Sequence, residues 1–333
     1  MPWTPLRRLL PLAVFALSAA APAPAGPPYR IGVFFWHDSP NDVATFAGLR
    51  EGLAQAGVAC EFVERRADSS TEKAHAAFVE LRAAHCDLIV VLGTQAALLA
   101  KVEVTDVPVL FAAVSDAVAS GIVPDWTGSG SNLFGASNWI APHNVLDVFR
   151  LAVPHLHRLG MLRSAVSGVV SLAERTTMQQ HLAEPGAPAV ELVEAIAGDA
   201  DDVAAAAQRL VAQGVDAIWI PIDITIYQDL AAVRRGLQGA RVPLLTTAAA
   251  GVRNGAVVGA VVDYPLHGRR AAALAREVLV HGRRPGDLPI DRLHGIQVTV
   301  SLAAARRDRL ELPLSLLALA DDLIDAEPAD AKR

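Results

Sequence analysis

The chain has 333 residues, of which 52% are hydrophobic and 19% charged, so it is long enough for two domains and too apolar to be disordered. Its formal net charge is −6 and no dense stretch of lysine and arginine occurs, which argues against nucleic acid as a partner. Arg7 and Arg8, the apolar stretch over 9–20 and the small residues before Gly26 have the pattern of an export signal. We therefore expect residues 1–25 to be cleaved and the mature protein to lie in the periplasm; the alternative is an uncleaved anchor, although the apolar stretch is short for spanning a bilayer.

The first part of the chain alternates strands with helices. Apolar runs predict strands over 29–36, 59–65, 87–92 and 107–114, and helices that start near 41, 71 and 96. The run before Ser115 and Asp116 carries no charge, which is typical of a parallel strand buried on both faces. This alternation predicts βαβ units with a parallel sheet.

The pattern restarts after the flexible patch over 128–132 and Pro142. Strands are predicted over 158–163, 190–196, 215–220, 242–245, 256–262 and 296–300, with helices over 142–153, from 202, over 266–281 and from 313 to 324. Two successive α/β halves imply a cleft between two lobes. The chain is expected to cross from one lobe to the other near Trp139, and residues 327–333 to form a loose tail.

Polar residues follow several of the predicted strands. In open α/β sheets, ligands bind beyond the carboxyl ends of the strands, so these residues are candidate ligand contacts: Trp36, Ser39, Thr94, Gln95, Ser115, Asp116, Trp139, Asp223, Thr225 and Thr247. A carboxylate on the ligand would suit the helix start after Gly93, and a cationic group would suit Asp116 or Asp223. For the acidic residues the alternative is capping of the next helix, and for the tryptophans it is ordinary packing.

Enzyme motifs are absent from the sequence. No G-x-S-x-G elbow, P-loop or G-x-G-x-x-G run occurs, and the pair His155 and His157 is a weak metal signal that fits a surface turn better. We therefore expect no enzyme activity, no cofactor and no metal. Cys60 and Cys86 could form a disulfide in an oxidising compartment or remain two buried thiols.

Four segments resemble one family in particular, the extracytoplasmic substrate-binding proteins of ABC transporters, in the branch whose better-known members bind tryptophan, tyrosine or phenylalanine. They are VPVLFAAVSDAVASGIV at 107–123, VDAIWIPIDITI at 215–226, GAVVGAVVDYPLHG at 255–268 and GIQVTVSLAAARRDRLELP at 295–313. The resemblance extends over almost the whole stretch 29–324.

The resemblance implies an α/β fold of the type I periplasmic-binding-protein kind, with two Rossmann-like lobes of parallel sheet joined by a hinge. Lobe 1 would comprise 29–138 and 264–292, and lobe 2 would comprise 139–263 and 293–326. Family contacts would fall on Thr94, Gln95, Ser115, Asp116, Asp223 and Thr225, with Asp263 at a crossing between the lobes.

This sequence also departs from the family pattern. Ile222 and Ile224 flank Asp223 where many relatives have a Thr-Asp-Asn run, and Thr247-Ala248 replaces a Ser-Asp pair. Without that carboxylate an α-amino group loses a natural partner, so a less cationic or more apolar solute becomes plausible.

The sequence thus predicts a monomeric periplasmic protein that captures a small molecule, amino-acid-like or small and organic, for an ABC permease by closure of the lobes. The alternative is a ligand sensor or adaptor that presents the same fold to a membrane receptor.

Overall fold

The computed structural model describes residues 27–166, 169–292 and 296–326. The predicted signal at 1–25 and the predicted tail at 327–333 lie outside the described residues. The described part of the chain contains no helix that is both long and apolar enough to cross a membrane.

The first sheet is built mainly from the amino-terminal part of the chain. Its strands are β1 (Tyr29–Phe35), β2 (Cys60–Arg66), β3 (Leu88–Leu92), β4 (Val109–Val114), β5 (Leu133–Ser137) and β11 (Asp291–Arg292). They lie in the order β11-β5-β4-β3-β1-β2, and every neighbouring pair is parallel. This is the parallel sheet that the alternating pattern predicted.

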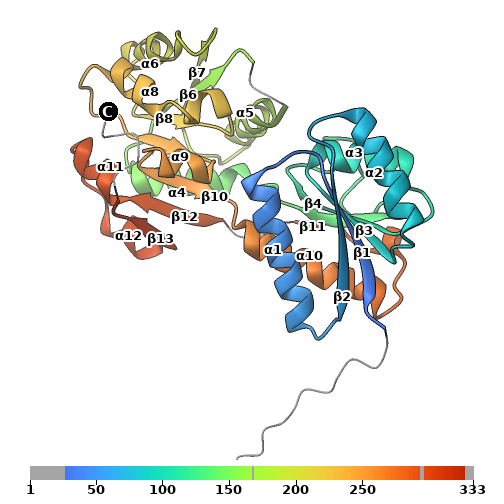
Figure 1. The fold of residues 1–333 in the computed structure, drawn as a ribbon. Coiled ribbons are helices and arrows are strands. Elements are labelled where there is room, and N and C mark those ends of the chain that lie inside the picture. Colours follow the sequence, from blue (N-terminus) through green and yellow to red (C-terminus); the bar gives the residue numbers. More distant parts are fainter. Residues whose placement is uncertain (1–26, 167–168, 293–295, 327–333) are drawn as a thin grey trace, which may run out of the picture.

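The second sheet takes the middle and the end of the chain. Its strands are β6 (Arg158–Ser164), β7 (Glu191–Ala197), β8 (Ala217–Ile220), β9 (Leu244–Thr246), β10 (Val258–Val261), β12 (Gln297–Ser301) and β13 (Asp322–Ile324). The order is β13-β12-β10-β9-β8-β6-β7, with β10 and β12 antiparallel and the other pairs parallel. The two sheets belong to two lobes (Figure 1).

Helices cover both faces of each sheet (Figure 1). The first lobe has α1 (Pro40–Gln55), α2 (Thr71–Ala83), α3 (Thr94–Glu103), α10 (Tyr264–Leu279) and the 3₁₀ turn η1 (Pro285–Asp287). The second has α4 (Pro142–Ala152), α5 (Val169–Leu182), α6 (Val203–Ala212), α7 (Ile224–Tyr227), α8 (Leu230–Leu237), α9 (Ala249–Arg253), α11 (Leu302–Arg307) and α12 (Leu314–Leu319).

The central strands β3 and β4 are apolar throughout because both faces of the sheet are covered there, whereas the edge strand β2 carries charged residues. In β1, Ile31, Val33 and Phe35 belong to one apolar cluster, and Phe34 belongs to the cluster on the opposite face. The alternation follows from the period of two residues in a strand. All five residues of β3 are buried for the same reason.

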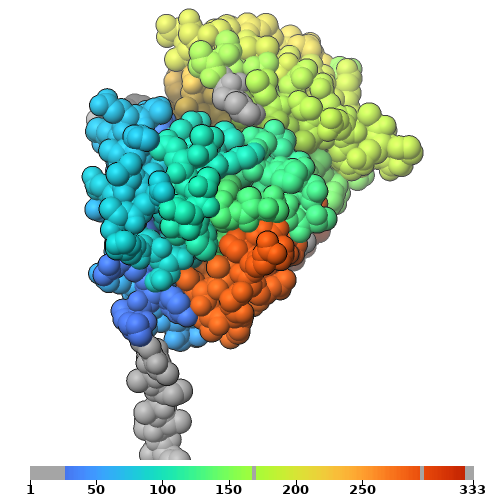
Figure 2. Space-filling view, turned by 90° about the vertical axis from the view of Figure 1, so that its right-hand side faces the viewer, coloured from blue at the N-terminus to red at the C-terminus, as the bar shows by residue number. Residues whose placement is uncertain are grey.

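The chain passes between the sheets three times, after β5, after β10 and after β11. The second passage leads into α10, which packs on α1 of the first lobe. Gly48 and Gly268 lie at this contact, where a Cβ on either residue would collide with the backbone of the other helix, at Pro265 or Thr45. The segment 264–292, in orange, therefore lies on the lobe of the blue and green residues, with the yellow-green lobe above it (Figure 2).

The prediction of one helix from 313 to 324 is wrong at its carboxyl end. Helix α12 ends at Leu319, and Asp322–Ile324 form the edge strand β13 beside β12. The Asp321 carboxylate accepts a hydrogen bond from the Val298 N–H at 2.7 Å, and the Asp321 N–H donates to the Val298 carbonyl at 2.8 Å. These bonds to β12 divert the chain, so Leu323 and Ile324 are strand residues rather than part of a helical face.

Candidate functional site

A cavity of about 60 Å³ lies where the carboxyl ends of the two sheets face each other. Residues that follow β4 and β5 form one side, and residues from α4, α5 and the ends of β8, β9 and β10 form the other. The lining residues are Ser115, Asp116, Asn138, Trp139, Ile140, Pro142, Val145, Val170, Ala173, Glu174, Thr177, Met178, Trp219, Ile222, Thr247 and Val262. Most of these are apolar, and the polar ones are few, as in many small-molecule sites.

An irregularity in β4 sets the position of Ser115 and Asp116. Ala113 has a φ of +55°, and the register with β5 breaks between Phe111 and Val114. The left-handed region is unfavourable for alanine by roughly 1–2 kcal/mol. The Ala113 N–H that this turn exposes donates to Nε2 of His267 at 3.1 Å, which helps to hold the strained backbone.

His267 is fully buried on α10. Burial lowers the pKa of its imidazole to about 4, so the ring is neutral at neutral pH. Because Nε2 accepts from Ala113, the proton of the neutral ring is on Nδ1. A helix that starts at a passage between the lobes thereby fixes the strand end that faces the cavity.

Asp116 has a capping role as well as a place in the cavity wall. Its Oδ1 accepts from the N–H groups of Val118 at 3.0 Å and Ala119 at 2.8 Å. The Ser115 carbonyl accepts from the Ser137 hydroxyl at 2.8 Å, which ties the end of β4 to the end of β5. This side of the cavity is thus fixed by hydrogen bonds to backbone groups.

Asn138 joins two of the passages between the lobes. It is 6% exposed, and its Nδ2 lies 3.4 Å from the hydroxyl of Tyr264, the first residue of α10. Within the described residues its Oδ1 has no hydrogen-bond partner. Burial raises the pKa of Tyr264, and the nearby carboxyl groups of Asp42 and Glu174 raise it further, so its hydroxyl stays protonated.

Helix α5 supplies the opposite wall. Val170, Ala173, Glu174, Thr177 and Met178 line the cavity, and their spacing places them on one face of the helix. Thr246 is the last residue of strand β9 and Thr247 follows it; of the two, Thr247 lines the cavity.

The carboxyl group of Glu174 is held at two points. Its Oε2 accepts from the Ile222 N–H at 2.8 Å, and it shares a hydrogen bond with the Thr247 side chain. The Thr247 hydroxyl in turn accepts from Nε1–H of Trp219 at 3.4 Å. Part of the Glu174 surface remains open to the cavity, but protein surrounds the group closely, and this burial raises its pKa to about 7. Near neutral pH Glu174 therefore changes easily between its neutral and charged forms.

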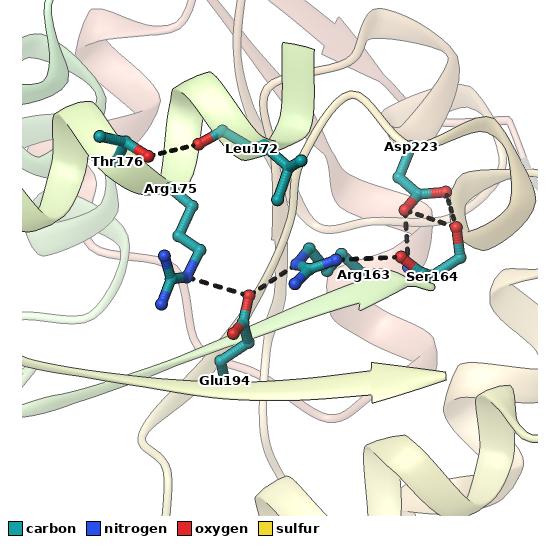
Figure 3. Close-up of polar contacts among 7 residues, drawn as sticks. All are labelled: Arg163, Ser164, Leu172, Arg175, Thr176, Glu194 and Asp223. Carbon is teal, nitrogen blue, oxygen red and sulfur yellow. Dashed lines mark hydrogen bonds and ion pairs between the residues drawn. The ribbon is translucent and has the colours of Figure 1, made fainter. Parts of the chain in front are cut away.

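One arginine of β6 and one of α5 pair with a carboxylate on β7. Arg163 and Arg175 both pair with the Glu194 carboxylate, at 2.6 Å and 3.1 Å (Figure 3). Arg175 follows Glu174 directly in the sequence, but its guanidinium turns to Glu194 on β7. None of the described lining residues is a lysine, arginine or histidine.

Asp223, which the sequence pointed to as a ligand contact, does not line the cavity in this conformation. It is 2% exposed, and its carboxylate accepts from the Ser164 N–H at 2.7 Å and from the Ser164 hydroxyl at 3.0 Å (Figure 3). The bonds connect the loop after β8 to the end of β6. Thr225 lies two residues further, in the short helix α7, and Ile222 lines the cavity instead.

The structure brings together four of the sequence-predicted residues: Ser115, Asp116, Trp139 and Thr247. The others lie at nearby element ends without lining the cavity. Ser39 and Asp263 cap α1 and α10, Thr94 and Gln95 begin α3, and Trp36 packs against the core of the first lobe.

Sequence reasoning missed Glu174 because it predicted no helix between the strands now called β6 and β7. A signal was present, since Val170, Ala173 and Thr177 have helical spacing and no proline or glycine interrupts 169–182. A single glutamate in such a helix does not differ from a solvated surface residue in sequence. In the described residues no group of three or more His, Cys, Asp or Glu side chains could hold a metal ion, and Cys60 and Cys86 are free thiols.

Comparison with solved structures identifies the fold. A ligand-free, open substrate-binding protein with adhesive properties from Clostridium difficile matches with a TM-score of 0.79 at 20% identity, over 90% of this chain and all of that one. A protein of Streptococcus pneumonia in complex with L-Trp matches with a TM-score of 0.68 at 22% identity, over 88% of this chain and all of that one. These likenesses show the two-lobed fold of type I periplasmic binding proteins.

Sequence comparison identifies the family. A tyrosine-binding protein of Clostridioides difficile is 25% identical over 215 residues, which cover 65% of this chain and 61% of the relative, so the match spans less than two thirds of that protein. The family model described as ABC transporter substrate binding protein matches residues 30–324. Substrate-binding proteins of this kind are not enzymes. The chain belongs to the family of ABC transporter substrate-binding proteins.

Proposed function

We propose that this protein is the extracytoplasmic solute-binding component of an ABC importer. The observation that carries the proposal is the cavity between the two sheets, where Ser115 and Asp116 of one lobe face Glu174 and Thr247 of the other. Apolar walls with a few fixed polar groups bind a small molecule by desolvating its body and pairing its polar ends. No bond is made or broken.

Capture requires the walls to move. The cavity of about 60 Å³ is well below the roughly 300–1,000 Å³ of typical small-molecule pockets, so a solute of amino-acid size would enter when the lobes separate. The rigid bodies would be 29–138 with 264–292, and 139–263 with 293–326. Asn138 and Tyr264 lie at the proposed boundaries and are hydrogen-bonded to each other, which supports a hinge at these residues.

Ser115, Asp116, Trp139 and Thr247 would contact the solute directly, since they line the cavity. Six other residues remain predicted contacts for other degrees of closure: Trp36, Ser39, Thr94, Gln95, Thr225 and Asp263. Asp223 would hold Ser164 in place rather than contact the solute in this conformation. The names of the relatives support an amino-acid-like solute, because one is a tyrosine-binding protein and another was solved with L-Trp.

Cleavage of residues 1–25 would release the mature protein into the periplasm, where an ABC permease would receive the solute. Family membership supports both points. Genes for a permease and an ATPase beside this one would support the importer role over a sensor role, and a receptor gene in their place would contradict it.

The test of capture is calorimetry and thermal shift on the mature protein with amino acids, amines, purines and small carboxylates. We expect saturable one-to-one binding of at least one class. Mass spectrometry of small molecules released from natively purified protein provides a second measurement. Failure of every class to bind, together with no released molecule, would contradict the proposal.

A further inference from the structure

The charges of the cavity are one-sided. Two carboxyl groups, Asp116 and Glu174, line it, and no cationic side chain does so among the described lining residues. Arg163 of β6 and Arg175 of α5 do not compensate, because both pair with Glu194 (Figure 3). An anionic group in this cavity would meet two acidic side chains without a counter-charge.

Glu174 is prepared to receive a hydrogen-bond donor. The Ile222 N–H and the Thr247 side chain hold the carboxyl group in place, and no ion pair to Glu174 occurs in the described part of the chain. Its raised pKa has burial as the largest cause, with no nearby positive charge among the causes. A cation that enters the cavity would supply the missing partner and favour the charged form of the carboxyl group.

Asn138 gives a second, independent indication of a missing donor. The side chain is 6% exposed and lines the cavity, and its Oδ1 is buried without a hydrogen-bond partner among the described residues. A buried acceptor without a partner destabilises the protein unless a ligand or a water molecule donates to it. A primary ammonium group has three donors and could serve more than one acceptor at once.

The rest of the wall suits an apolar body. Trp139 and Trp219 provide flat rings, and Met178 provides an adaptable side chain that packs well against aromatic groups. Val145, Ile140 and Val262 complete the apolar surface. None of the described residues on this surface carries a positive charge that would neutralise a ligand carboxylate.

We infer that the solute is a primary amine with a flat apolar body, that its ammonium group pairs with Glu174, and that a carboxylate on the solute is not needed for binding. This inference rests on the proposed function and specifies its substrate class. It also answers the departure at Thr247-Ala248, because Glu174 supplies from α5 the carboxylate that the sequence lacks after β9.

Matched ligands separate the contributions of the two charges. Tryptamine, L-tryptophan and indole-3-propionate carry the amine alone, both groups and the acid alone, and phenethylamine, L-phenylalanine and 3-phenylpropionate repeat the series on a smaller ring. We expect calorimetry on the mature protein at pH 7.5 to show that at least one of the amines binds as tightly as its amino acid or more tightly. Neither acid should bind.

The Glu174→Gln variant tests the assigned partner. The amide oxygen can still accept from the Ile222 N–H, so the fold should persist, while the charge is lost. We expect amine affinity to fall by about 10- to 100-fold, the usual effect of losing a hydrogen bond to a charged group. Glu184→Gln is the matched control, since Glu184 lies just beyond α5 and its side chain, among the described residues, bonds to His181 and does not line the cavity; it should leave affinity unchanged.

The outcomes distinguish this inference from the proposed function. Equal or tighter binding of an acid, amine affinity unchanged in Glu174→Gln, or a natively released solute without an amine would overturn the inference while solute capture stands. If no ligand binds and native protein releases no small molecule, the capture proposal itself fails. Circular dichroism of both variants checks that a lost affinity does not come from unfolding.

Discussion

The two walls of the cavity differ in how they are built. On the first lobe, Ser115 and Asp116 follow a strand and are held by hydrogen bonds to Ser137, Val118 and Ala119. On the second lobe, helix α5 presents side chains, and two hydrogen bonds fix the carboxyl group that matters most. The first wall is therefore positioned by backbone hydrogen bonds and the second by side chains. We expect substitutions that support the first wall to lower stability, and substitutions in α5 to change ligand selectivity.

The largest effect is expected from His267, which supports the first wall from behind. His267→Ala would leave a void and deprive the strained Ala113 N–H of its acceptor, at a cost of about 3–4 kcal/mol in the free energy of unfolding. Urea denaturation measures this loss. His281→Ala, at an exposed position after the same helix, should change stability by less than about 0.5 kcal/mol. A loss as small as the control would show that Ala113 does not depend on His267.

The same residue makes stability depend on pH. Its folded pKa of about 4 is below the ordinary 6.5, so between these values the unfolded chain binds more protons and stability falls as the pH falls. Over the whole window between the two pKa values, the unfolding free energy falls by about 3 kcal/mol. Glu174 and Asp42 act in the opposite direction, because burial raises the pKa of each to about 7. We therefore compare the free energy of unfolding of the wild type with that of His267→Gln. The difference between the two should shrink from pH 7 to pH 4.

The sequence was informative about the backbone-built wall. Uninterrupted apolar runs such as the one before Ser115 identify strands buried on both faces, and the residues after a parallel strand necessarily lie at one edge of the sheet. This reasoning found Ser115, Asp116, Trp139 and Thr247. It could not find that Asp223 turns to Ser164, because the direction of one side chain depends on which strand lies next to β8 in space.

The side-chain-built wall was beyond the sequence for a different reason. A helix with a weakly apolar face, such as α5, has no uninterrupted apolar run, and Glu174 alone gives no sign that it points inward. Its role emerges only when the lobes are placed together and Ile222 and Thr247 are seen beside it. The same lack of tertiary information led the last strand to be predicted as the end of a helix.

Asp223→Ala tests whether Asp223 stabilises the fold or contacts the solute directly. Removal of its carboxylate leaves the buried Ser164 N–H and hydroxyl without their acceptor, which should cost about 2–3 kcal/mol of unfolding free energy. Solute affinity should change by less than about threefold, which corresponds to less free energy than the loss of one hydrogen bond. Asp147→Ala, at an exposed position on α4, is the control for loss of an acidic residue. A large loss of affinity with little loss of stability would restore Asp223 as a direct contact.

Glu174→Gln should stabilise the solute-free protein while it weakens binding. The folded pKa of about 7 is above the ordinary 4.5, so the folded state holds the proton longer and wild-type stability falls as the pH rises through this window. The amide does not titrate, and the variant should gain about 1–3 kcal/mol over wild type by pH 8, with little gain at pH 4.5. Thermal unfolding at the two pH values measures the gain. An equal gain in stability at both pH values would mean that the pKa of Glu174 is not raised in the folded protein.

Asp116 lies between the two extremes, because it both supports a turn and faces the cavity. Asp116→Ala removes the acceptor for Val118 and Ala119 together with the charge, and should weaken solute binding by about 1.5–3 kcal/mol. Asp116→Asn keeps an oxygen for the turn and removes only the charge, so the effect on amine affinity should drop to about 1 kcal/mol, below that of Glu174→Gln. Calorimetry on both variants separates the roles. If alanine and asparagine weaken binding equally, the charge of Asp116 contacts the solute directly; if asparagine has no effect at all, the first wall contributes shape alone and the second wall provides the electrostatic selection.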